Sequence, residues 1–516
     1  MRYLTYKPEG CQGSIDSYLP QMVKELYQLL SKTQRSILKS YLHLKNEAIQ
    51  ELAGILVDVA ADIHCDIGIW KCYERYNMKF FGTPLPLTEH KFVKPINDIH
   101  LDRLRHLLWV LCRELSDVPV LSPVDENIQD LAETAQSFLN DRYASLPQDS
   151  GIKAFFETPD HYGWDIKRKL VWLGSKSYLF RTFFHQYMLE ECDGKSQIGH
   201  TDDFICQQCT PWSGLGVIDI LAGVLYIEDG DRKDLRSWYE RHAAPYKVLS
   251  ANSKILKVLN TINNQEYLVR INMKSHPFAP GLLVIGSLTP WRGEWYWSGE
   301  QRYIEKPSQS LIDDLKKNMV RRSPDIIYRY DKESEQKAVK QMAELHSSAL
   351  AFYGKDLMIY PDGLSMAADW QKEFRHNWAS KAPEAVEEVV KKHGLKNNRP
   401  DISIPEDLLE SKDGLGVFLN PDSGKEIMVQ FDYVVSGFRR KGVGLNQAEE
   451  EAIRAIVCLD TISPIFVQRM VKEFGDESIK SSFRLKDTNE TYWLDYLLRC
   501  HKGSFLRKRY PAVSIV

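Results

Sequence analysis

The residues best suited to metal chemistry lie between positions 192 and 209. Zinc prefers cysteine and histidine ligands, four of them in a tetrahedron. The chain offers Cys192, His200, Cys206 and Cys209. Two residues separate Cys206 from Cys209, a gap that lets both thiolates reach one ion. Strong zinc motifs contain two such close pairs and this segment has one, so we favour packed free thiols and keep structural zinc as the alternative.

A second pattern has the spacing of a magnesium-dependent nuclease. Pro324-Asp325 followed by Glu335 and Lys337 imitates the PD-(D/E)xK motif, in which two carboxylates hold Mg²⁺ and a lysine assists the attacking water. The motif requires its glutamate and lysine on a core strand. Residues 331–337 are instead highly polar, which is typical of a solvated helix face. Asp325, Glu335 and Lys337 are therefore catalytic candidates only under a metal-dependent hydrolase or nuclease hypothesis that we do not favour.

Motifs for other reactions are incomplete. Gly194-Lys195-Ser196 ends like a phosphate-binding loop, but Leu189 stands where the first glycine must be. The sequence contains neither a GxSxG nucleophile elbow nor an HExxH zinc helix. We therefore lean towards a protein that is not an enzyme, although residues distant in the chain can assemble a site that no local motif reveals.

The segment 291–297 is the best candidate for a binding surface. In a strand, Trp295 and Trp297 share one face and Tyr296 points to the other. Small barrels bind single-stranded nucleic acid on aromatic platforms flanked by cations, where stacking contributes about 1–3 kcal/mol per base. A small barrel also needs large aromatics for its own core, which is the commoner use of such rings. The candidate binding residues are Arg270, Trp291, Arg292, Trp295 and Trp297, with Lys274 nearby.

These aromatics belong to a stretch with the period of β-strands. Short apolar or β-branched runs separated by turn residues predict a small antiparallel β-barrel-like module at about 245–300. We expect Tyr267, Val269, Ile271 and Met273 to face its core and Arg270 to face outwards. The five predicted strands are 246–249, 255–259, 267–273, 282–288 and 295–297.

Helical periodicity dominates on both sides of this module. Apolar residues at spacings of three and four predict a helical domain over 1–150, with a helix beginning at Ser122-Pro123. Residues 151–305 form a mixed region that contains the β module. Residues 306–516 form a mainly helical domain, with a short strand at 357–360. The sequence thus predicts a multidomain α+β protein.

Composition limits the compartment and the partners. Apolar residues make up 43% and charged residues 27% of the chain, so most of it can fold into packed domains. A net charge of −3 argues against a generally basic nucleic-acid-binding surface. We find neither a signal peptide nor a run of about 18 apolar residues, so we expect a cytoplasmic protein with no membrane contact.

The basic residues near the C-terminus, Arg499 to Arg509, could contact phosphate, but such tails are more often solvated. Our leading hypothesis is a non-catalytic binding or regulatory protein that acts through a macromolecular partner, with the central module as its recognition surface. We favour another protein as that partner. The alternatives are a nucleic-acid-binding protein that uses the same module and the metal-dependent hydrolase described above. Turnover by the pure protein would contradict the leading hypothesis.

Overall fold

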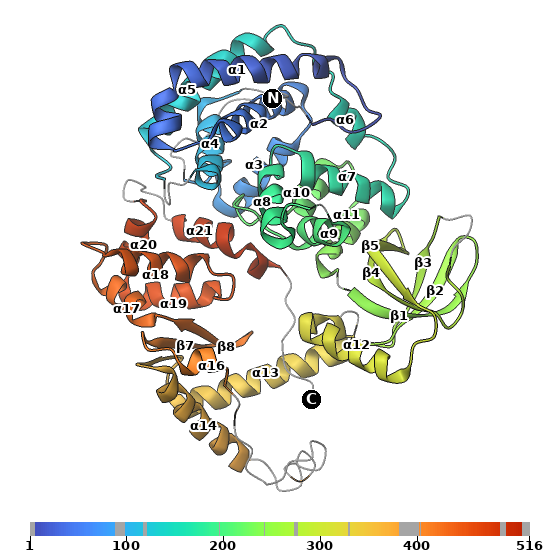
Figure 1. Ribbon diagram of the computed structural model, residues 1–516, viewed down its shortest axis with the longest axis vertical. Helices are drawn as coiled ribbons and strands as arrows, with labels where there is room; N and C mark the ends of the chain where they lie inside the picture. The colour runs from blue at the N-terminus through green and yellow to red at the C-terminus, as the bar shows by residue number, and fades with distance from the viewer. Residues whose placement is uncertain are drawn as a thin grey trace. The chain divides into compact units, whose positions relative to one another are not determined.

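The computed structural model describes residues 6–87, 99–116, 121–195, 197–241, 243–272, 277–328, 331–380, 387, 402, 404–485 and 492–507. The chain divides into two compact units (Figure 1). The first unit contains Met1–Arg329 and Arg484–Arg507, and the second contains Tyr330–Phe483 and Lys508–Val516. The last predicted domain ran without interruption from 306 to 516. In the structure the second unit begins at Tyr330, and residues 484–507 return to the first unit.

The first unit begins with helices, as predicted. They are α1 (Leu19–Thr33), α2 (Asn46–Cys65), α3 (Ile69–Phe81), α4 (Leu101–Leu115), α5 (Glu126–Tyr143), α6 (Gly151–Phe156), α7 (Gly163–Lys176), α8 (Arg181–Cys192), α9 (Ile198–Gln207), α10 (Val217–Val224) and α11 (Asp229–Ser237). Helix α5 begins later than Ser122-Pro123, because the Asp125 carboxylate accepts from the backbone N–H groups of Asn127 and Ile128 and caps it there.

Five strands follow the helical region. They are β1 (Ala243–Ala251), β2 (Ile255–Asn260), β3 (Glu266–Arg270), β4 (Leu283–Trp291) and β5 (Glu294–Ile304). Their order is β1–β2–β3–β5–β4, and β1 also pairs with β4, which closes the sheet. The pairing is antiparallel except between β3 and β5, which are parallel at Val269 and Trp295. The prediction of a purely antiparallel module is wrong at this one pairing.

The core of the β module follows the predicted alternation. Tyr267, Val269 and Ile271 are buried in it, whereas Met273 lies outside the described residues. Arg270 points outwards with a quarter of its side chain exposed. Helices α9 and α11 pack on β5 and β4, respectively. Helix α12 (Gln309–Arg322) follows the strands, and α21 (Trp493–Lys502) completes the first unit.

The second unit is a sheet covered on both faces. Its elements are α13 (Lys332–Tyr353), β6 (Leu357–Tyr360), α14 (Gly363–Ala379), α16 (Glu406–Leu409), β7 (Leu415–Asn420), β8 (Gly424–Val429), α17 (Phe431–Arg439), α18 (Gln447–Cys458), α19 (Pro464–Phe474) and α20 (Glu477–Ser482). Strand β6 has the predicted bounds. Leu415, Val417 and Leu419 of β7 pack beneath α13 and α14. On the other face, Phe418 stacks on Phe466 of α19 with ring centroids 4.9 Å apart.

Helices account for 59% and strands for 12% of the structure, so the prediction of a mixed helix and strand protein is confirmed. Among the described helices, none has the length and apolar character needed to cross a bilayer.

Two buried histidines make the stability of the first unit sensitive to acid. Burial lowers the pKa of His106, which contacts the Tyr73 hydroxyl at 2.6 Å, and that of His501, in both cases to about 3. The unfolded chain binds these protons near pH 6.5, whereas the folded chain does not. Stability is therefore expected to fall as the pH falls from about 6.5 towards 3, by about 1.4 kcal/mol per pH unit for each histidine.

Calorimetric unfolding of the full chain at several pH values would measure this slope. His106→Gln should reduce the slope, and substitution of the exposed His185 should leave it unchanged. If stability depended equally on pH in the unaltered chain and in both variants, the assignment of this dependence to the buried His106 would be contradicted.

Candidate functional site

An aromatic cleft lies in the first unit where α7 meets the β module. Its volume is about 160 Å³. Its walls carry four aromatic side chains and two cations, namely Trp164, Trp238, Tyr296, Trp297, Lys167 and Arg270. Apolar walls with a few polar groups are typical of ligand sites.

The start of α7 fixes one wall of the cleft. Tyr162 precedes the helix, and its backbone N–H donates to the Asp165 carboxylate at 3.0 Å. Tyr162 stacks on Trp164 at 4.7 Å, and Trp164 meets the Tyr296 ring edge-on at 5.3 Å. A Cβ atom at Gly163 would lie 2.6 Å from the Tyr296 ring, so only glycine allows this close approach. Backbone and rings therefore hold the aromatic wall in place.

Both cations of the cleft are already paired. The Lys167 ammonium lies 2.7 Å from Asp202 and donates to Ser298 Oγ at 2.9 Å. The Arg270 guanidinium donates to Glu294 at 2.8 Å and lies 5.4 Å from the centroid of the Tyr162 ring. The carboxylates offset most of the positive charge of the two cations, so little net positive charge remains in the cleft to hold a polyanion.

One donor in the cleft has no acceptor. Trp297 Nε1 is buried and has no hydrogen-bond partner within the described part of the chain. A buried donor without a partner costs about 1–3 kcal/mol, and a ligand that supplies an acceptor would recover this.

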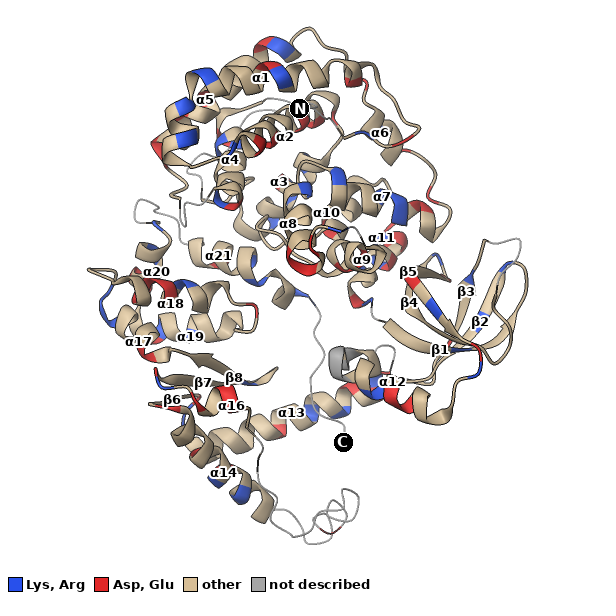
Figure 2. Cartoon of the chain, in the orientation of Figure 1, with Lys and Arg blue, Asp and Glu red and all other residues tan. Residues whose placement is uncertain are grey.

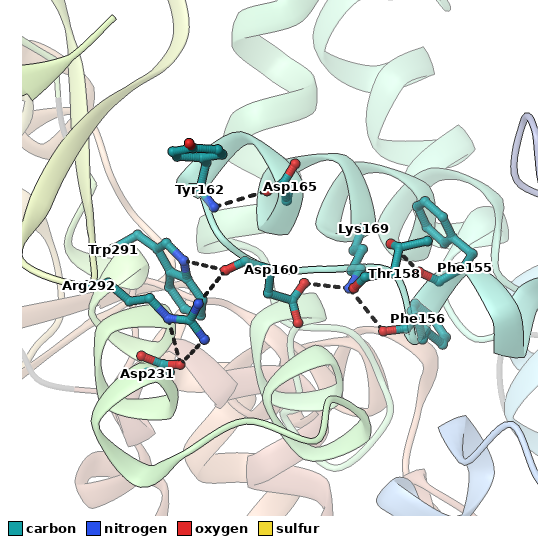
Figure 3. A network of polar contacts seen from close by, with 10 residues as sticks. All are labelled: Phe155, Phe156, Thr158, Asp160, Tyr162, Asp165, Lys169, Asp231, Trp291 and Arg292. Atoms are coloured by element: carbon teal, nitrogen blue, oxygen red, sulfur yellow. Dashed lines mark hydrogen bonds and ion pairs between the residues drawn. The ribbon is translucent and has the colours of Figure 1, made fainter. Parts of the chain in front are cut away.

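A polar network beside the cleft anchors the turn between β4 and β5 (Figure 3). Both turn residues, Arg292 and Gly293, have positive φ (+50° and +78°), the geometry favoured in tight hairpins. Arg292 donates to Asp231 at 2.5 Å and to the Asp160 backbone carbonyl at 2.9 Å. The Trp291 indole N–H donates to the same carbonyl at 3.0 Å.

The carboxylate of Asp160 continues the network into the core. It pairs with the ammonium of Lys169, whose side chain is 0% exposed. Lys169 also donates to the backbone carbonyls of Phe156 and Thr158 at 2.9 and 2.7 Å. These three contacts provide an acceptor for each N–H group of the buried Lys169 ammonium. Through Asp160 they also hold the β4–β5 hairpin against the helices.

The structure separates the predicted binding residues. Arg270 and Trp297 line the cleft, and Trp295 is half-buried against the core of the β module, 4.8 Å from Tyr267. Trp291 is fully buried, so the expectation that its ring stands open to a ligand is wrong. Arg292 keeps 41% of its side chain exposed and pairs with Asp231. Lys274 lies outside the described residues.

Sequence reasoning did not find Trp164 or Trp238 as site residues. The only local signal was the aromatic pair that brackets Gly163 at the start of α7.

The four candidate zinc ligands are not grouped into a metal site. Within the described residues, no group of three or more His, Cys, Asp or Glu side chains is placed to hold a metal ion. Burial raises the pKa of Cys206, and it raises that of Cys209 to about 11. A thiol with a raised pKa stays protonated at neutral pH.

The nuclease pattern is not supported by its local structure. Glu335 lies in the first turn of α13 and not on the core strand that the motif requires. Lys337 pairs with Glu333 at 2.7 Å on the exposed side of that helix. The backbone of Asp325 lies in a short 3₁₀ helix, and its side chain is not described.

These features define the first unit as a helical body joined to a closed five-stranded sheet, with an aromatic cleft at the junction. Residues 2–194 are similar to a family described as a protein of unknown function (DUF3843). Comparison with the curated proteins and with the solved structures gives no match for the chain.

Proposed function

We propose that the chain is a non-catalytic binding protein whose aromatic cleft receives a planar group from a macromolecular partner. The observation that carries this proposal is the combination of aromatic walls with the unpartnered Trp297 Nε1 donor. A planar group with an acceptor at its edge would stack on Trp164 and accept from the Trp297 indole. The described lining contains no histidine, cysteine or carboxylate that could serve as a general base.

Charge favours a protein partner. Figure 2 shows acidic and basic residues interspersed over the β module and the helices beside it. Binding of nucleic acid draws much of its energy from unpaired cations that neutralise phosphates. Lys167 and Arg270 are both paired, so the cleft suits an aromatic or amide-bearing side chain of a protein better than a polyanion.

The strand order favours single-stranded nucleic acid as a second candidate. A five-stranded barrel in which β1 pairs with both β2 and β4, and β3 runs parallel to β5, has the connectivity of the oligonucleotide/oligosaccharide-binding fold. Bases could stack on the same rings, with modest dependence on salt because the cations are paired.

Trp164→Ala is the test of the cleft. The full chain would be purified natively, its partner identified by mass spectrometry, and the affinity for that partner and for single-stranded oligothymidylate measured. Loss of one central tryptophan is expected to weaken binding by about 2 kcal/mol, roughly 30-fold. Tyr303→Ala is the matched control, because Tyr303 is an exposed aromatic of β5 that does not line the cleft.

Equal binding by Trp164→Ala and Tyr303→Ala would contradict the proposal. Binding of oligothymidylate that Trp164→Ala abolishes would establish the second candidate instead. Turnover of any substrate by the pure protein would overturn the non-catalytic assignment.

A further inference from the structure

The second unit contains a larger cavity that the proposed function does not use. Its volume is about 550 Å³, and it lies between α13, α14 and the β7–β8 hairpin. Met342, Leu345 and Phe374 form an apolar wall, while Trp370, Glu373 and Lys425 form a polar end. We propose that this cavity binds a small organic carboxylate with an apolar body.

The polar end is organised around the Lys425 ammonium. Lys425 pairs with the Oε2 atom of Glu373, and the Tyr353 hydroxyl donates to the same oxygen at 2.8 Å. Burial, together with this carboxylate, raises the pKa of Tyr353, so the hydroxyl keeps its proton and remains a donor. The ammonium also lies 4.5 Å from the Trp370 ring centroid and 5.7 Å from that of Tyr353. Ring faces stabilise a cation at this range.

The balance of donors and acceptors points to an anionic head group. Glu373 is 6% exposed and receives two donors on one oxygen, so its charge is shared between Lys425 and Tyr353. Lys425 has three N–H groups and keeps 28% of its side chain exposed. Trp370 Nε1 is buried without an acceptor among the described residues. A ligand carboxylate could accept from Trp370 and Lys425 together, which satisfies both donors.

The hairpin fixes the position of Lys425. The Asn420 side-chain carbonyl accepts from the backbone N–H of Asp422 at 2.8 Å, and Gly424 takes a positive φ of +89° to close the turn. Lys425 then pairs across the strands with Leu419, whose side chain packs under α13 and α14. The ammonium is therefore positioned by rigid elements before any ligand arrives.

A carboxylate fits this end better than a phosphate does. One ammonium, already shared with Glu373, cannot balance the charge of a dianion. The apolar wall, in contrast, favours a hydrocarbon or aromatic body, because burial of each CH₂ group stabilises binding.

The test is titration of the full chain with octanoate by calorimetry, with 1-octanol and octylamine as probes of the same length. We expect octanoate to bind at least tenfold more tightly than 1-octanol and octylamine to bind most weakly. Trp370→Phe, which keeps an aromatic ring and removes the N–H, should weaken octanoate binding roughly threefold to tenfold. Lys412→Met replaces an exposed lysine that does not line the cavity and should leave binding unchanged.

Lys425→Met alone leaves Glu373 without its cation and could unfold the unit. The double variant Lys425→Met/Glu373→Gln removes both charges and should lose the preference for octanoate over 1-octanol while keeping its circular dichroism spectrum. Equal affinity for octanoate and 1-octanol in the unaltered chain, or octanoate binding that neither variant changes, would overturn the proposal. Because the aromatic cleft lies in the other unit, neither result bears on the proposed function.

Discussion

Asp160→Ala is expected to destabilise the first unit by about 3–5 kcal/mol, the cost of leaving a buried charge without its partner. The Lys169 side chain is 0% exposed, and its remaining contacts would be two backbone carbonyls. Carbonyl dipoles satisfy the N–H groups but do not balance the charge. A loss of this size is a large fraction of the stability of a typical domain.

The double variant Asp160→Ala/Lys169→Met separates lost charge balance from lost packing. An apolar side chain of similar length in place of the lysine should recover most of the stability, because no unpaired charge remains buried. Glu266→Ala is the control, since its pair with Lys257 is exposed on the β2–β3 hairpin and should contribute less than about 1 kcal/mol. Calorimetry of the full chain can resolve the transition of the first unit from that of the second. A similar small loss of stability in all three variants would show that the Asp160–Lys169 ion pair is not needed for the stability of the first unit.

The same network explains what the sequence could and could not predict about the β module. Alternation of Tyr267, Val269 and Ile271 identified a strand and its buried face, because side chains on a strand alternate with a period of two. Periodicity could not show that Trp291 is buried and Arg292 paired. Their partners, Asp160 and Asp231, lie 131 and 61 residues away in the chain.

The aromatic cleft could not be predicted from neighbouring residues, for a similar reason. Trp164 comes from the start of α7, Trp238 from a short 3₁₀ turn and Tyr296 from β5, so no motif of adjacent residues contains them. In the second unit, every residue of β7 is buried, which removes the alternation that identifies a half-exposed strand. Strand β6 was predicted correctly because a helix-ending glycine, Gly354, and the Asp362-Gly363 turn bracket it.

The basic stretch near the C-terminus shows how packing overrides composition. Arg499 lies 4.2 Å from the Phe80 ring centroid, Lys502 is buried, and Arg507 lies 3.6 Å from that of Tyr239. These side chains are neither a solvated tail nor free for phosphate. Lys508 and Arg509 lie outside the described residues.

Ending the chain at Phe483 is therefore expected to unfold the first unit. The deletion removes α21, whose Tyr496 ring packs 5.6 Å from Trp109 and 6.0 Å from Phe81. The buried side chains lost with this helix include Trp493, Tyr496, Leu497 and Leu498. Burial of each contributes about 1.5–3 kcal/mol, so their sum rivals the total stability of about 5–15 kcal/mol.

A chain that ends at Arg507 is the matched control, because it keeps α21 and should retain the stability of the first unit. A fragment of residues 330–483 should fold alone, since its sheet is covered on both faces by its own helices. Limited proteolysis, with calorimetry of each protein, would measure these outcomes. Cooperative unfolding of the first unit in the chain that ends at Phe483 would show that α21 is dispensable. The contiguous C-terminal domain predicted for 306–516 would then be the better description. The expected result is the opposite: the first unit is completed only by the residues that follow the second.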